Sequence, residues 1–127
     1  MPIKFKAIER GEPGVPGGGT KKWYATTVIQ GERNIDQLTT SIEKISTVSG
    51  ADIRAVLYAM VDVCTEELAN GNIVRFGDLG SMRVSISSVG APTALEVNSS
   101  IITKNRILFN PGPRLVNMLG RLIYQKA

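Results

Sequence analysis

Histidine is absent from this chain of 127 residues, and cysteine occurs once, at Cys64. One cysteine cannot form an internal disulfide, and a zinc site without histidine would lack its usual ligands. The Ser-His and Cys-His nucleophile pairs of many hydrolases are excluded by the same composition. Cys64 lies between Val63 and Leu68 on a predicted helix, which favours a buried small hydrophobe over a reactive thiol. We therefore expect no metal, no cofactor, no small-molecule substrate and no enzymatic activity.

Long apolar runs are missing as well. No run approaches the roughly 20 residues that cross a membrane. Residues 1–6 alternate apolar and charged side chains instead of building the apolar block of a signal peptide. With 43% hydrophobic and 20% charged residues, the composition is that of a globular protein, and the length suits one domain. These features predict a soluble, cytoplasmic protein with no membrane partner.

The net charge of +4 is small, but the charges are segregated along the chain. Residues 1–32 hold five basic and three acidic side chains, residues 33–78 hold four and seven, and residues 79–127 hold six and one. A basic C-terminal third beside an acidic middle is typical of a surface that faces a polyanion. Taken alone, the same charges could simply be solvated.

Two short strands are predicted near the N-terminus. Ile3, Phe5 and Ala7 alternate with charged residues, and residues 23–29 are aromatic and β-branched, so the two segments can pair as a hairpin. Residues 11–19 between them are rich in Gly and Pro and predict a flexible loop. The triple glycine in this loop is not a phosphate-binding motif, because no Gly-Lys-Ser/Thr and no helix follow it.

Trp23 and Tyr24 in the second strand allow two interpretations. Their rings could stack on nucleic-acid bases, or they could pack against a sheet or a dimer partner. We favour packing.

Two amphipathic helices follow. Asn34 is a predicted N-cap, Gln37 completes a capping box, and the first helix runs from about 35 to 48 with one apolar stripe. Ser49 repeats the cap signal for a second helix that extends to about Ala69. The two helices predict a packed pair.

The second helix is apolar on more than one face, which is wider than a lone domain of this size needs, and the extra face predicts a partner subunit. The helix pair could also be a helix-turn-helix DNA reader. Its second helix, however, carries four acidic side chains against Arg54 alone, a poor surface for a groove lined by phosphates. We therefore favour a packed helix pair over the helix-turn-helix interpretation.

The segment from Val74 to Val84 is predicted to be a tight β-hairpin, because its apolar residues alternate on both sides of a corner. Gly77 and Gly80 bracket that corner, where the backbone needs a positive φ or a close approach to another strand.

The order of these segments adds a family resemblance. It is carried by NGNIVRFGDLGSMRV at residues 70–84, by RILFNPGPRL at residues 106–115, and by the helix pair before them. Over about residues 33–126 the chain resembles the bacterial histone-like HU and integration host factor family. The resemblance implies an α+β fold: two N-terminal helices, a three-stranded antiparallel sheet with an arm-like extension, and a C-terminal helix, paired as a two-fold homodimer. Residues 1–32 would add an N-terminal β-hairpin, as in a divergent branch of the family, and residues 33–127 would form the DNA-binding domain.

The arm departs from the family pattern. The resemblance places a two-stranded, DNA-wrapping arm at residues 85–105, yet no Lys or Arg stands between Arg83 and Lys104, and Glu96 is acidic. Pro92 could match the proline that arms of this family wedge between base pairs, but its neighbours do not resemble that motif. We favour a shortened arm that does not wrap DNA.

The resemblance also implies a function: non-enzymatic, nucleoid-associated binding of double-stranded DNA at the backbone and minor groove, with low sequence specificity. The predicted closing helix begins at Pro113, has Leu122 and Ile123 on its apolar face, and carries cations beside the arm. The candidate DNA contacts are Arg75, Arg83, Lys104, Arg106, Arg114 and Arg121. The alternative is a dimerisation or protein-interaction module on the same fold, favoured by the arm that lacks cations and by the added strands.

Overall fold

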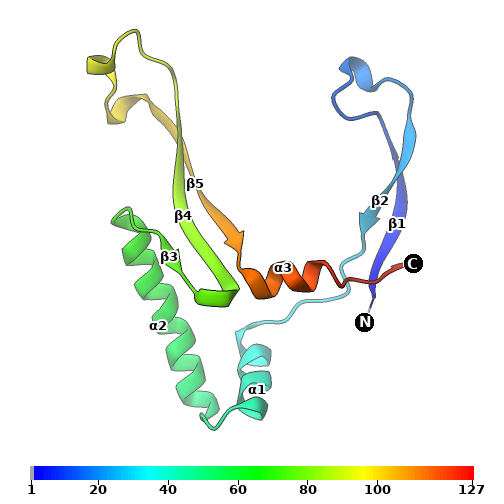
Figure 1. The fold of residues 1–127 in the computed structure, drawn as a ribbon, viewed down its shortest axis with the longest axis vertical. Coiled ribbons are helices and arrows are strands. Elements are labelled where there is room, and N and C mark those ends of the chain that lie inside the picture. Colours follow the sequence, from blue (N-terminus) through cyan, green and yellow to red (C-terminus); the bar gives the residue numbers. More distant parts are fainter. Residues whose placement is uncertain (1) are drawn as a thin grey trace. The chain divides into compact units, whose positions relative to one another are not determined.

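The computed structural model describes residues 2–127, and the chain divides into two compact units. The central unit is Arg33–Asn117, and the terminal unit combines the residues before Arg33 with Met118–Ala127. The fold is α+β, as predicted, and its described residues form three α-helices and two three-stranded sheets (Figure 1). None of the helices in this described part is both long and apolar enough to span a membrane.

Two helices open the central unit: α1 (Ile35–Ile45) and α2 (Gly50–Ala69). The predicted capping box is confirmed, because Gln37 N donates to Asn34 Oδ1 at 2.9 Å and Asn34 N donates to Gln37 Oε1 at 3.0 Å. Ser49 Oγ accepts a hydrogen bond from a backbone N–H in the first turn of α2 at 3.3 Å. Both helices therefore begin where the sequence predicts, and they pack against each other.

Three antiparallel strands follow in the order β3–β4–β5, as predicted. They are β3 (Val74–Arg75), β4 (Gly80–Ser88) and β5 (Ile102–Pro111), and a short 3-10 turn, η2 (Gly77–Leu79), joins the first two. Figure 1 shows β3 between α2 and β4, and α2 contacts both of these strands. Helix α2 thus lies against the short-strand side of the sheet.

The corner between β3 and β4 depends on two glycines. Gly77 has a φ of 62° and Gly80 a φ of 139°, a range that side chains with a Cβ avoid. Gly80 also lies against β5, where an added Cβ would overlap the carbonyl oxygen of Asn110. The predicted need for a positive φ and a close approach is confirmed at this turn.

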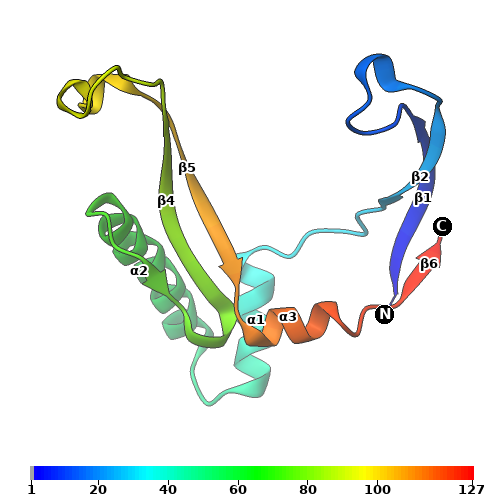
Figure 2. The ribbon, with the colours of Figure 1, turned by 45° about the horizontal axis from the view of Figure 1, so that its top comes forward.

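Beyond the corner, β4 and β5 continue as a two-stranded arm. Their pairing extends to Ser88 and Ile102, with a register shift next to Ser87. The arm tip holds two single 3-10 turns, η3 (Ala94–Glu96) and η4 (Ser99–Ile101). Figures 1 and 2 show the two strands side by side up to this tip. The paired strands occupy the region where the family resemblance implies an arm.

The terminal unit is a sheet of strand order β2–β1–β6. Strand β1 (Ile3–Arg10) pairs antiparallel with β2 (Lys22–Thr27), so the predicted N-terminal hairpin is present. The loop between them contains a 3-10 turn, η1 (Pro16–Gly18). On its other edge, β1 pairs in parallel with β6 (Tyr124–Lys126), which Figure 2 shows beside it. The C-terminal end of the chain therefore completes the N-terminal sheet.

The closing helix is shorter than the sequence predicts. The apolar pattern continues through Leu122 and Ile123, but α3 spans only Pro113–Leu119, so the prediction is wrong for these two residues. Ile123 instead accepts a backbone hydrogen bond from Ile3 at 2.7 Å. The β-branched and aromatic residues after the helix suit a strand, and pairing with the edge of β1 outweighs the helical period.

The single chain buries few large apolar side chains. Ile53, Cys64 and Leu68 on α2 are buried, which confirms the interpretation of Cys64 as a core residue. Other apolar side chains of α2 stay in solvent, and Val63 is 59% exposed. On β5, Phe109 is 47% exposed. The sequence predicts that a partner subunit covers an extra apolar face of α2. In a single copy of the chain that face is uncovered, which accounts for the exposed side chains of α2.

Candidate nucleic-acid interface

Four of the six candidate cations project from one face of the β3–β4–β5 sheet. Side chains alternate between the two faces of a strand, and residues paired across antiparallel strands share a face. The register pairs Arg75 with Ser81, Ser81 with Asn110, Arg83 with Leu108, Ser85 with Arg106, and Ser87 with Lys104. The odd-numbered residues of β4 and their partners therefore form one surface. We call this surface, with Arg75, Arg83, Lys104 and Arg106, the cationic sheet face.

Short polar side chains, together with Leu108, lie between these cations. The polar residues are Ser81, Ser85, Ser87 and Asn110. Hydroxyl and amide groups can donate hydrogen bonds to phosphate oxygens, and small side chains let a ligand approach the strand backbone. None of the residues of β3, β4 and β5, all of which are described, is acidic. The cationic sheet face therefore attracts anions without an opposing charge in its own strands.

The opposite face of the same sheet is apolar. Its paired residues are Val74, Met82, Val84, Ile86, Ile107 and Phe109, with Asn105 near the arm tip. Several of them are exposed in the single chain, including Ile107 at 60%. The sheet thus has two sides of different chemistry, one suited to an anionic ligand and one suited to another protein surface.

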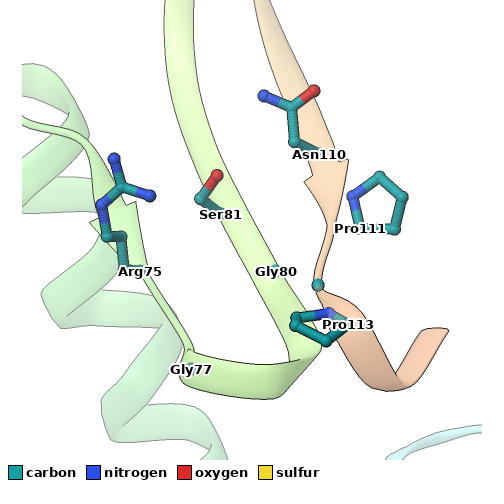
Figure 3. A pocket seen from close by; sticks show the side chains of 8 residues that line it. Arg75, Gly77, Gly80, Ser81, Asn110, Pro111 and Pro113 are labelled. Carbon is teal, nitrogen blue, oxygen red and sulfur yellow. The ribbon is translucent and has the colours of Figure 1, made fainter. Parts of the chain in front are cut away.

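An open hollow of about 410 Å³ lies at the base of the cationic sheet face. It is lined by Arg75, Gly77, Gly80, Ser81, Asn110, Pro111, Gly112 and Pro113 (Figure 3). The glycines add no side chains, so much of the surface of the hollow is backbone. Its side chains include a guanidinium, a hydroxyl and an amide, three groups that can bind a phosphate oxygen. The hollow therefore continues the cationic sheet face to the corner of the sheet.

The remaining two candidate cations lie outside the sheet. Arg114 is in the first turn of α3, and its Nε is 3.9 Å from Asp78 Oδ2. Both side chains are largely exposed, so this pair is weak and leaves Arg114 able to meet another anion. Arg121 follows α3 in a turn, where its N–H donates to Met118 O at 3.0 Å. It belongs to the terminal unit, and the structure does not group it with the four sheet cations.

The side chains of this surface can bind an anion through charge and hydrogen bonds. The serine hydroxyls have no histidine to activate them, since the sequence contains none. Across residues 2–127, no three His, Cys, Asp or Glu side chains are grouped so that they could hold a metal ion. Positive charge and hydrogen-bond donors on an extended strand surface suit an extended anionic ligand such as a nucleic-acid backbone.

The cations of this face were predicted from the sequence, whereas the polar residues that share the face were not. The signal was available in β4, where Ser81, Arg83, Ser85 and Ser87 alternate with apolar residues at a period of two. The basic residues of β1 were not predicted as candidate binding residues either, because their alternation with apolar residues was used only to predict a strand.

Comparison with known proteins agrees with the observed architecture. The profile of a family described as an HU domain fused to a wHTH, Ig or glycine-rich motif matches residues 1–126. The crystal structure of a candidate bacterial DNA-binding protein from Bacteroides vulgatus is similar, with a TM-score of 0.65 and 14% sequence identity. The match covers 98% of this chain and 48% of that protein, so the chain spans about half its length. No curated protein matches the sequence.

Proposed function

The chain belongs to the family of HU domains fused to a wHTH, Ig or glycine-rich motif, and we propose that it is a non-enzymatic DNA-binding protein of the bacterial nucleoid. In this proposal the cationic sheet face holds the backbone and minor groove of a duplex. The similar Bacteroides vulgatus protein, itself a candidate DNA-binding protein, supports this direction.

The observation that carries the proposal is the segregation of charge on one sheet. Arg75, Arg83, Lys104 and Arg106 share a face with small polar residues, and their strands carry no acidic side chain. Basic side chains that neutralise phosphates release condensed counterions, which supplies affinity that does not depend on base sequence. Serine and asparagine contacts to phosphate and sugar fix the position of a duplex without reading it. We therefore propose low sequence specificity.

We propose that the DNA-binding species is a homodimer. In the single chain, α2 exposes Val56, Tyr58, Val61 and Val63, and the apolar side of the sheet exposes Ile107 and Phe109. Exposed apolar surface of this extent is typical of a protein interface, and a second copy of the chain is the commonest partner for such a surface. Two copies would also double the number of sheet cations available to one duplex.

Titration of a fluorescent duplex with the purified protein tests the proposal. We expect the variant Arg83→Gln/Arg106→Gln to bind every duplex at least about tenfold more weakly, because each charge-assisted hydrogen bond to a phosphate contributes about 1 kcal/mol or more. The matched control is Lys44→Gln/Arg54→Gln, which removes two charges from α1 and α2 of the same unit and should bind like the wild type. Equal affinity of both variants would contradict the assignment of the face.

A second candidate function is a protein-interaction module without DNA binding. The arm tip favours it, because Leu95 is 98% exposed and no Lys or Arg lies between Arg83 and Lys104. The same duplex titration separates the two functions. An absence of duplex binding even at about 50 mM salt, where phosphate attraction is strong, would favour the interaction module.

A further inference from the structure

The net positive charge of the protein lies entirely in its terminal unit. That unit holds seven basic and three acidic side chains, whereas the central unit holds eight of each. The central unit nevertheless attracts anions locally, because its cations are separated from its acids by the strand alternation described above. The terminal unit adds an overall excess of positive charge, and none of these cations belongs to the cationic sheet face.

The register of the terminal sheet gathers four of these cations on one side. Strand β1 alternates, so Lys4, Lys6 and Arg10 share a face, and Arg10 is paired with Lys22 of β2. All four side chains are exposed. Glu9, the acidic residue within these two strands, points to the other face, where it is paired with Trp23. We call the surface formed by Lys4, Lys6, Arg10 and Lys22 the terminal basic face.

An aromatic ring fixes one of these cations. The guanidinium of Arg10 lies 4.7 Å from the centre of the Tyr24 ring, within the range of a cation–π interaction. One face of the Tyr24 ring is therefore covered by Arg10 and is not open to a stacked base. The stacked guanidinium still has N–H groups at its edge, which can bind a phosphate in a forked geometry. This arrangement favours backbone contacts over base stacking.

The dimensions and chemistry of the face suit the backbone of a duplex. From Lys4 to Arg10 the strand covers about 20 Å at about 3.3 Å per residue, a length that faces several successive phosphates. Lys22 is paired with Glu12 at 2.6 Å, so the free charge is concentrated on β1. Ile8 and Tyr24 share the face with the cations but are only partly exposed, whereas the largely exposed Trp23 lies on the opposite face. A membrane surface would need large exposed apolar groups beside the cations.

We propose that the terminal basic face is a second DNA-binding surface, which allows the protein to hold two duplexes at once. The inference rests on the proposed function of the central unit, because the first duplex occupies the cationic sheet face. The second duplex binds through its phosphates to Lys4, Lys6 and Arg10. The two faces belong to different compact units, so in this proposal each face holds its own duplex and the protein bridges two DNA segments.

A two-colour capture experiment tests the inference. A biotinylated duplex is fixed on beads, the full-length protein is added, and the retention of a fluorescent duplex from solution is measured. The test variant is Lys4→Gln/Lys6→Gln. The matched control is Lys21→Gln/Lys126→Gln, which removes the same amount of charge from the terminal unit. Lys21 lies just before β2, and Lys126 lies on the opposite face of the sheet. Binding of each variant to a single short duplex is measured in parallel by anisotropy.

We expect the wild type and the control to retain the fluorescent duplex. The Lys4→Gln/Lys6→Gln variant should retain at least about tenfold less fluorescent duplex than the wild type. Its affinity for a single duplex should stay within about threefold of the wild-type affinity. Retention by the test variant at the wild-type level would overturn the inference. So would a wild type that binds one duplex but retains no second, although that result would leave the proposed function intact. A wild type that binds no duplex would refute both proposals. Co-sedimentation with anionic phospholipid vesicles is measured for the same variants, and a loss of vesicle binding by the test variant with unchanged duplex retention would overturn the inference and assign the face to lipid.

Discussion

At the scale of single residues, the corner of the central sheet should be most sensitive at Gly80. Gly77→Ala places a Cβ in open space at a φ of 62°, and we expect it to lower the free energy of unfolding by about 1 kcal/mol. Gly80→Ala adds overlap with the Asn110 carbonyl to an unfavourable φ, so its cost should exceed about 2 kcal/mol. Urea denaturation of both variants measures the difference. Equal costs would show that the close approach of β5 is not what requires glycine at this position.

The role of single cations can be separated from that of the arm tip. Arg83→Ala should weaken binding to all duplexes alike and flatten the dependence of log affinity on log salt by about 0.9 for each phosphate that the variant no longer neutralises. Pro92→Ala should change little if the arm does not wedge into DNA, because Pro92 lies in the arm tip beyond the paired strands. A variant at Pro92 that binds more weakly than Arg83→Ala would mean that the arm wedges into DNA.

The candidate site was predictable in part at this scale. The family resemblance pointed to Arg75, Arg83, Lys104 and Arg106 as candidates, and the last three also lie in the basic C-terminal third. It could not show that these residues share a face, because that depends on the pairing of Ser85 with Arg106 and of Ser87 with Lys104, which lie far apart in the chain. Arg121 fell in the wrong element because the end of α3 was predicted too late.

At the scale of elements, helices were easier to predict than the short edge strand. The caps at Asn34 and Ser49 and the apolar period are local signals, so α1 and α2 begin where the sequence places them. Strand β6 has three residues and exists through pairing with β1, at the opposite end of the chain. No local pattern carries that information, and the apolar period of Leu122 and Ile123 favoured a longer helix instead.

This account of β6 predicts a local effect of truncation. Removing residues 123–127 takes away the acceptor for the N–H of Ile3 and exposes the edge of β1. We expect the Ile3 amide to exchange with solvent faster, while amides of α2 in the other unit keep their protection. Removing Ala127 alone is the control, since it leaves the Ile3 hydrogen bond in place. Unchanged exchange at Ile3 in the longer truncation would argue against the parallel pairing.

At the scale of the whole molecule, the exposed apolar surface predicts an obligate dimer. Sedimentation at micromolar concentration should show no monomer of the wild type. Val63→Glu puts a charge on the exposed apolar surface of α2, so it should dissociate the dimer without disturbing the residues that the single chain buries. Ser41→Glu, on the polar surface of α1, is the control. A stable, folded monomer of the wild type would contradict the dimer.

The central claim is that DNA is held by phosphate contacts from a small cationic surface, and the salt dependence of duplex affinity tests it most directly. If a dimer neutralises about 4 to 6 phosphates of one short duplex, log affinity should fall with log salt at a slope of about −4 to −5, and the slope should be the same for unrelated sequences. Binding that persists unchanged between about 50 and 200 mM salt, or that depends strongly on base sequence, would contradict the account.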